Sequence, residues 1–190
     1  LSISYAVLHL SDVETSFDFV LKHLVETLMN NRDWQARYGA ALAIQYIIKH
    51  EKHTQWYKKI FEHCVECMND VSDDVRNVVA GALSDLTRHV HRMRRSDGNT
   101  TIVWKKEDCE MLLSKMTECL KDADNFCVSP SNVLSCINAL LVYAKDYCQD
   151  VWVAFRDHFL ELSSYLMHGI TSVRVEALSL FRVHLVDFFK

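Results

Sequence analysis

The chain has 190 residues and a formal net charge of −4, with 49% hydrophobic and 24% charged residues. This composition is ordinary for a folded soluble protein and excludes an intrinsically disordered chain. The negative net charge argues against a nucleic-acid-binding role for the whole chain, because phosphate affinity needs clustered cations. No apolar run approaches the roughly 20 residues that a membrane-spanning helix needs.

Hydrophobic residues repeat at three- and four-residue steps along the whole sequence, which predicts helices and no strands. The predicted helices cover, in chain order, residues 17–28, 36–47, 57–68, 75–90, 112–120, 133–141, 151–167 and 172–190. Residues 94–106 show no period and predict an exposed insertion. The sequence begins without the charged region and cleavage site of a signal peptide, and we interpret its first residues as the tail of an earlier helix in a longer chain.

Capping residues precede most of these helices. Ser11 and Glu14 form a capping box before the first, Asp33 and Asp73 cap the second and the fourth, and Pro130 suits the first position of the sixth. Thr54 is expected to cap the third helix in the same way. Taken two by two along the chain, the eight predicted helices make four pairs.

One phrase recurs at the start of three of these helices, in residues 33–41, 73–80 and 171–178. Each copy has a capping residue, a small or β-branched residue before an arginine, and then small and apolar residues at helical spacing. The arginines are Arg37, Arg76 and Arg174. The first two stand about 40 residues apart, and a period of this length built from helix pairs is typical of HEAT and armadillo arrays. We predict an all-α solenoid, with residues 1–190 as a single HEAT-repeat array.

Four residues of the phrase are assigned structural roles: Trp34, Arg37, Arg76 and Arg174. Each arginine near a helix start can reach an acidic residue of an adjacent turn, which would form a ladder along the stack. A binding role for these arginines is the alternative.

Nothing in the sequence predicts catalysis or a cofactor. None of the four glycines lies in a phosphate-binding G-x-x-x-x-G-K-[ST] motif, so no ATP-hydrolysing motor is expected in this segment. Cys64 and Cys67 form a Cys-x-x-Cys pair, but both fall on an apolar helical face, and we interpret them as core thiols rather than zinc ligands. The odd number of cysteines, seven, favours reduced thiols in a cytosolic or nuclear protein.

A basic run leads into the predicted insertion and includes Arg92, Arg94 and Arg95. Cations at a helix C-terminus interact favourably with the helix dipole, which gives the run a structural explanation. Contact with DNA phosphates or an acidic partner is the functional alternative.

Four phrases in order resemble those of one HEAT array, the N-terminal region of the TATA-binding-protein-associated remodelling ATPases, also called the modifier-of-transcription-one family. The phrases are Trp34-Gln35-Ala36-Arg37-Tyr38-Gly39-Ala40-Ala41-Leu42; Asp73-Asp74-Val75-Arg76 with Val79-Ala80; Asp124-Asn125-Phe126 with Ser129 and Asn132; and His168, Ile170, Ser172-Val173-Arg174 with Ala177-Leu178. Together they span nearly the whole chain. Gln35, Tyr38 and Asn125 depart from the family pattern, as does the insertion.

The resemblance implies a segment of a nuclear transcription regulator whose HEAT array grips TATA-binding protein. A C-terminal motor outside this segment would use ATP to remove that protein from promoter DNA, so this segment would meet DNA only indirectly. Because TATA-binding protein is basic, carboxylates in the turns are candidate contacts by charge complementarity. The candidates are Asp70, Asp73, Asp74, Asp122 and Asp124; helix capping and loop solvation are the alternative.

Two other functions stay open on the sequence alone. The chain could be a HEAT scaffold of a nuclear transport receptor or of a chromosome-condensation complex. The second is an enzyme that uses the cysteines and histidines, although no oxyanion hole or orienting group is apparent.

Overall fold

A computed structural model describes residues 14–50, 56–97, 104–121, 130–156 and 159–188. The described residues are helical apart from short turns, and none of them lies in a strand. This confirms the predicted all-α solenoid class. No helix within these ranges has the length and apolar character needed to cross a membrane. The chain divides into two compact units, residues 1–102 and 103–190.

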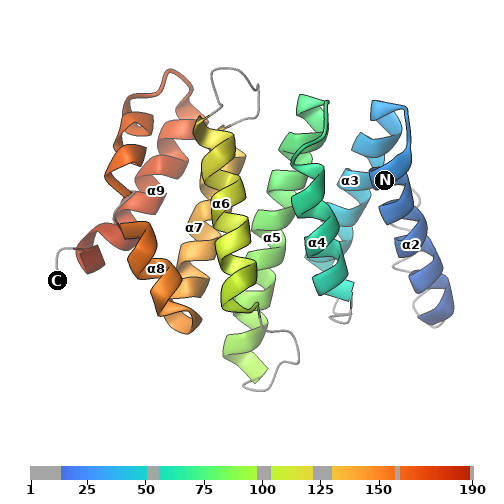
Figure 1. The fold of residues 1–190 in the computed structure, drawn as a ribbon, viewed down its shortest axis with the longest axis horizontal. Helices are drawn as coiled ribbons and strands as arrows, with labels where there is room; N and C mark the ends of the chain where they lie inside the picture. Colours follow the sequence, from blue (N-terminus) through green and yellow to red (C-terminus); the bar gives the residue numbers. More distant parts are fainter. Residues whose placement is uncertain (1–13, 51–55, 98–103, 122–129, 157–158, 189–190) are drawn as a thin grey trace. The chain divides into compact units, whose positions relative to one another are not determined.

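The first unit contains two antiparallel helix pairs (Figure 1). The first pair is α2 (Glu14–Asn30) and α3 (Trp34–His50), and the second is α4 (Tyr57–Cys67) and α5 (Asp73–Asp97). Helices α3 and α5 pack against each other, with α2 against α3 and α4 against α5. The core between them is aliphatic and aromatic, and includes the fully buried Ile44, Ile48, Phe61, Leu83 and Leu86.

The second unit repeats this arrangement. Helix α6 (Lys106–Lys121) pairs with α7 (Pro130–Tyr147), and α8 (Gln149–Arg156) is followed by the 3₁₀ helix η2 (Phe159–Met167) and by α9 (Thr171–Phe188). Helices α7 and α9 pack together and η2 packs against α9. Pro130 is the first residue of α7, as predicted. The hydroxyl of the buried Tyr143 donates to the carbonyl of Trp104 at 3.2 Å.

The seventh predicted helix, residues 151–167, is wrong in its continuity. The structure has α8 up to Arg156 and a 3₁₀ helix from Phe159. Phe159 and Leu162 are buried and Tyr165 is half-buried, so the inward-facing residues recur every three positions. This period matches the three residues per turn of a 3₁₀ helix, whereas an α-helix would rotate these side chains progressively away from the core.

The predicted insertion is also shorter than expected. Helix α5 continues through Arg94 and Arg95 to Asp97, and α6 begins at Lys106; residues 98–103 lie outside the described ranges, as do the predicted caps Ser11 and Thr54. Arginines in the last turn of α5 complement the negative end of its dipole, which favours the extra helical turn.

Gly39 and Gly81 both lie in the middle of a helix, and only Gly81 makes a close contact with another helix. A Cβ at Gly81 of α5 would lie 2.9 Å from the amide nitrogen of Gln45 on α3, whereas a Cβ at Gly39 would meet nothing within 4 Å. Gln45 is held there because it donates to Asp85 at 2.8 Å. Gly81 therefore allows α5 to approach α3, whereas the exposed Gly39 has no such role.

Candidate functional site

The repeated arginine occupies the same helical position in all three copies of the phrase. The backbone amide of Arg37 donates to Asp33 at 3.2 Å, that of Arg76 to Ser72 at 3.1 Å, and that of Arg174 to Ile170 at 3.3 Å. Each is a bond to the residue four positions earlier. Helix α5 is therefore capped at Ser72, not at the predicted Asp73, which lies inside the first turn.

Each arginine turns back and holds the loop that precedes its own helix. The Nη1 group donates to the carbonyl six residues earlier in every copy: to Asn31 at 2.8 Å from Arg37, to Asp70 from Arg76, and to His168 at 2.6 Å from Arg174. These bonds satisfy carbonyls that the preceding helix or turn leaves open. The structural role predicted for the three arginines has a common geometric basis.

The residue six positions before each arginine also accepts a hydrogen bond through its side chain. The side chain of Asn31 accepts a hydrogen bond from the backbone amide of Asp33 at 2.9 Å. In the same way Asp70 accepts from the amide of Ser72 at 2.8 Å, and His168 accepts from the amide of Ile170 at 3.1 Å. Asparagine, aspartate and histidine share little in a sequence comparison, which is why the pattern of residues did not reveal this position.

Asp70 does more than its two equivalents, because it also binds the first helix pair. Nε of Arg37 lies 2.6 Å from one carboxylate oxygen and Nη2 lies 2.8 Å from the other. The two side chains are only 10% and 7% exposed. This bidentate pair connects the start of α3 to the turn between α4 and α5, which is the kind of contact that the predicted ladder requires.

The electrostatics of the pair follow from this geometry. Burial alone would raise the pKa of the Asp70 carboxyl, but the hydrogen bonds from Arg37 and from the Ser72 amide, together with the nearby charge of Arg76, lower it. The hydrogen bonds that Arg37 donates to Asp70 raise the pKa of Arg37. Both groups are charged at neutral pH, and each stabilises the other's charged form.

The candidate contact residues in this region therefore differ in availability. The carboxylate of Asp70 is largely shielded and committed to Arg37, so a partner would have to break that ion pair to reach it. Asp73 is half-exposed and pairs with Arg76, whereas Asp74 is exposed. Asp122 and Asp124 lie outside the described residues.

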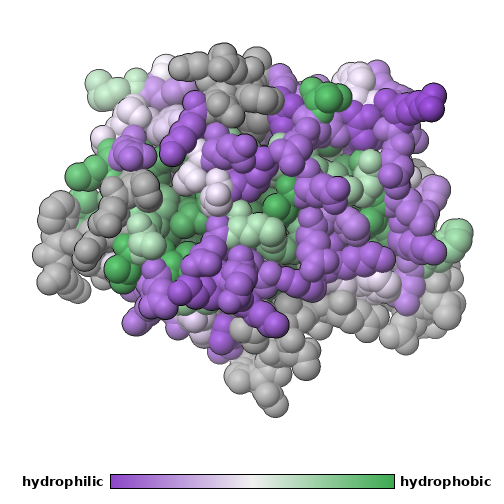
Figure 2. Space-filling model, viewed as in Figure 1, coloured by the Kyte–Doolittle hydropathy of each residue, from purple (hydrophilic) through white to green (hydrophobic). Residues whose placement is uncertain are grey.

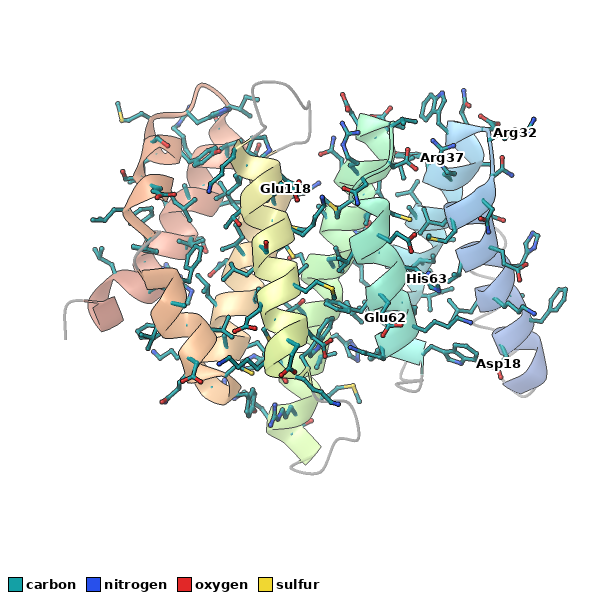
Figure 3. All side chains as sticks on the ribbon, viewed as in Figure 1. Asp18, Arg32, Arg37, Glu62, His63 and Glu118 are labelled. Atoms are coloured by element: carbon teal, nitrogen blue, oxygen red, sulfur yellow. The ribbon has the colours of Figure 1, made fainter. Side chains whose placement is uncertain are left out.

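A surface of mixed character surrounds the ion pair. Asp33, Trp34, Val71 and Asp74 are all exposed, Val71 by 89% and Trp34 by 41%, and the ion pair of Arg37 holds their two turns side by side. We call these four residues the turn edge. The exposed Arg32 borders it, and Figure 3 shows Arg32 and Arg37 together at this end of the first unit. Trp34, predicted to be structural, meets only the ring edge of Tyr38 among the described aromatic rings.

The predicted basic run lies at the far end of α5 from the turn edge. Arg92 and Arg95 are exposed and Arg94 is half-exposed. Arg94 and Arg95 occupy the last turn of the helix, where their charges face the negative end of the helix dipole.

The Cys-x-x-Cys pair lies in the core of the first unit. Burial raises the pKa of the Cys64 thiol far above its usual value and that of Cys67 to about 12. Cys67 donates to the sulfur of Met29 at 3.3 Å. No group of three or more metal-ligating side chains occurs in the described ranges.

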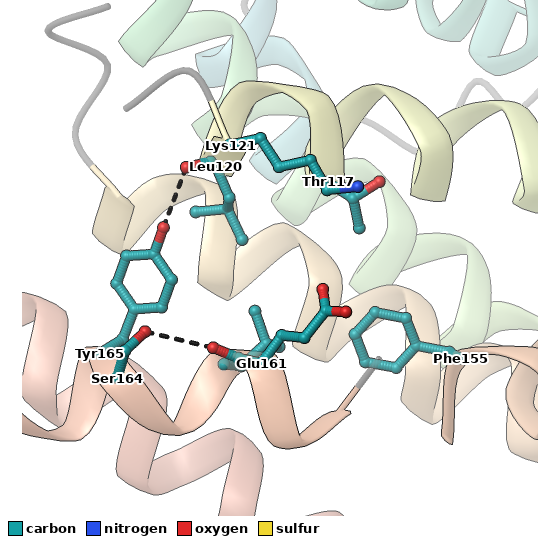
Figure 4. Close-up of a pocket in the computed structure, with 8 residues that line it drawn as sticks. Thr117, Leu120, Lys121, Phe155, Glu161, Ser164 and Tyr165 are labelled. Atoms are coloured by element: carbon teal, nitrogen blue, oxygen red, sulfur yellow. Dashed lines mark hydrogen bonds between the residues drawn. The ribbon is translucent and has the colours of Figure 1, made fainter. Parts of the chain in front are cut away.

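A groove of about 240 Å³ lies between α6 and η2 in the second unit (Figure 4). Tyr165 donates across it to the carbonyl of Leu120 at 3.0 Å, and Phe155 and Leu162 form its apolar wall. Lys121 and Glu161 are the charged residues of the lining. Figure 2 shows hydrophobic side chains between hydrophilic ones on this face, over α6 and α8. The hydroxyl of Ser164, which also lines the groove, donates to the backbone carbonyl of Glu161 at 3.1 Å.

Comparison with known proteins supports a HEAT-like helical region. The chain is similar to the human TATA-binding protein-associated factor 172, with 22% identity over 172 residues that cover 84% of this chain. The match spans only 9% of that relative's length. No family model matches the sequence, and no solved structure matches it. The chain is thus a HEAT-like helical scaffold with a distant similarity to a transcription-associated protein.

Proposed function

We propose that this chain is a protein-interaction scaffold of a nuclear transcription regulator and that its partner is TATA-binding protein. The supporting observation is the similarity to a TATA-binding protein-associated factor over 84% of the chain. In this proposal a motor elsewhere in the parent protein hydrolyses ATP and removes the partner from promoter DNA, while this segment neither hydrolyses ATP nor holds DNA itself.

The turn edge is the contact surface that we assign to this function. It combines two exposed carboxylates, Asp33 and Asp74, with the apolar side chains of Trp34 and Val71. Aromatic residues are enriched at protein interfaces, and carboxylates complement a basic partner. The ion pair beneath holds the two turns in one register, so the partner would meet a preformed surface.

The test is a binding measurement with purified TATA-binding protein and two matched variants. Asp74→Lys reverses an exposed charge on the turn edge, and Glu62→Lys reverses an exposed charge on the outer surface of α4, away from that edge (Figure 3). We expect Asp74→Lys to slow association about threefold at low salt and less at high salt, because exposed charges act mainly through screened, long-range attraction. Glu62→Lys should leave the rate unchanged.

Circular dichroism must show that both variants remain folded. Equal association rates for the two variants would remove the turn edge from the interface. If the wild-type chain binds TATA-binding protein no better than an unrelated helical protein at micromolar concentration, the proposed partner is wrong.

A further inference from the structure

Two cysteine side chains from different elements meet in the second unit. The Sγ atom of Cys109, in the first turn of α6, lies 3.9 Å from the Sγ atom of Cys148, which stands between the end of α7 and the start of α8. Cys109 is fully buried, whereas Cys148 is half-exposed. One sulfur is therefore open to a small reagent from solvent, and the other lies behind it and in contact with it.

The structure around both cysteines holds them in this arrangement. The backbone amides of Cys109 and Cys148 each donate to the carbonyl four residues earlier, at 3.2 and 2.7 Å. Nζ of Lys106 lies 3.2 Å from a carboxylate oxygen of Asp150, which joins the start of α6 to the start of α8 a second time. The two helix starts are thus already held together, and the sulfur atoms need to approach by about 2 Å to reach the length of a disulfide bond.

The Cys-x-x-Cys pair of the first unit differs in its access to solvent. Cys64 and Cys67 are both buried, and both lie on α4. In a reducing compartment disulfides are mostly transient and either catalytic or redox-sensing. Redox-sensing thiols combine a solvent-accessible cysteine with a second one beside it that resolves the oxidised form. Cys148 and Cys109 have this arrangement.

We propose that Cys109 and Cys148 are a site of reversible oxidation and that the oxidant is a hydroperoxide, in the simplest case hydrogen peroxide. Cys148 in its thiolate form attacks one peroxide oxygen and the O–O bond breaks, which leaves a sulfenic acid on Cys148 and releases hydroxide that takes up a proton. The sulfur of Cys109 then attacks the sulfur of Cys148 and loses its proton, and the sulfenic oxygen leaves as water.

The reaction balances without another reagent. Two thiols lose two electrons and become one disulfide, and hydrogen peroxide gains them and becomes two molecules of water. A thiol reductant reverses the reaction by thiol–disulfide exchange. This inference does not depend on the proposed function.

The cross-link would act on a second groove, about 280 Å³ in volume, between α6 and α8. Glu110 and Val151 line this groove, and they follow Cys109 by one residue and Cys148 by three. A disulfide would fix the separation of the two helices at this point. It would also join residues 39 positions apart, which removes conformational entropy from the unfolded chain. Oxidation should therefore stabilise the second unit.

Treatment of the purified, reduced protein with a small excess of hydrogen peroxide tests the proposal. Peptide mass spectrometry without reduction should identify a linked pair of peptides that contain Cys109 and Cys148. We expect the melting temperature to rise by about 5 °C or more. Dithiothreitol should return it to its original value.

Two variants separate the roles of the two thiols. Cys148→Ser removes the accessible thiol and should abolish both the linked peptides and the rise in melting temperature. Cys109→Ala removes the resolving thiol, so the sulfenic acid on Cys148 should persist and dimedone should label it about fivefold more than in the wild type. Cys119→Ser, at another half-exposed cysteine, is the control and should respond as the wild type does.

Circular dichroism must show that each variant is folded; if Cys109→Ala is not, the linked peptides and Cys148→Ser still decide. Oxidation of Cys148 without a link to Cys109 would overturn the proposal. A disulfide between two copies of the chain in place of the internal one, seen as a dimer on a non-reducing gel, would also overturn it. A rise in melting temperature that persists in Cys148→Ser would assign the effect to other thiols, with the same consequence.

Discussion

The ion pair between Arg37 and Asp70 predicts a large loss of stability from a nearly isosteric change. Asp70→Asn keeps an acceptor for the Ser72 amide but removes the charge that faces Arg37 at 2.6 and 2.8 Å. Arg37 keeps its bonds to the carbonyls of Asn31 and Arg32. The expected cost is about 2 to 3 kcal/mol, below the range for a fully buried charge that loses its only partner.

Chemical denaturation with urea, followed by circular dichroism, measures this cost. Asp74→Asn is the matched control, because it makes the same chemical change in the same turn at an exposed carboxylate; it should cost under about 0.5 kcal/mol. A double-mutant cycle with Arg37→Met should give a coupling energy of at least about 1 kcal/mol. Equal losses for Asp70→Asn and Asp74→Asn would refute the structural role of the pair.

The same pair makes the stability depend on pH in a defined direction. The pKa of Asp70 is lowered in the folded state, so its contribution is complete above the unfolded-state pKa of about 3.9 and is lost as the pH falls through the folded-state value. The difference between wild type and Asp70→Asn should therefore be constant from about pH 5 to 8 and shrink below about pH 4. A difference that persists at about pH 2 would contradict the charge-based explanation.

Three further experiments test separate features. Gly39→Ala should stabilise the protein by about 1 kcal/mol through helix propensity, whereas Gly81→Ala should gain little or lose stability because its Cβ would displace a side chain of α3; equal gains in urea denaturation would contradict the close approach. His168→Asn should be tolerated and His168→Ala should cost about 1 kcal/mol, since asparagine makes the equivalent bond in the first unit; the two melting temperatures decide this. Cys67 should be alkylated by iodoacetamide at pH 8 far more slowly than the half-exposed Cys119, and equal rates in peptide mass spectrometry would mean that its thiol is not buried.

The helices and their pairing could be predicted because they depend on local signals. Apolar periodicity located α2 to α7 and α9, and Pro130 marked the start of α7. A contact of Arg37 with an acidic residue of the next turn could also be expected, since repeats of equal length place equivalent turns next to each other. These features can be predicted without knowing which atoms are in contact.

The remaining features depend on contacts between distant residues. The bond of Gln45 to Asp85 joins residues 40 positions apart, and neither residue is distinguished by its neighbours in the sequence. Asp108 was missed for a different reason: it accepts the amide of Lys105 at 3.0 Å at the start of α6, but no capping residue of the usual type precedes it. The sequence does not distinguish the 3₁₀ segment from an α-helix, because periods of 3 and 3.6 residues nearly coincide over a short run.

The turns show why one repeated phrase produces two kinds of link. Asn31, Asp70 and His168 occupy the same position and all bind the amide at the helix start. The bonds that the side chains of Asn31 and His168 accept lie within their own turns. A carboxylate has a second oxygen and a charge, so it can also bind the arginine of the preceding pair, as Asp70 does. An ion-pair link between neighbouring pairs therefore needs two residues: a carboxylate six positions before one arginine, and an arginine near the start of the second helix of the preceding pair. Helix α7, which precedes His168, carries Val133 at the position that Arg37 holds in α3.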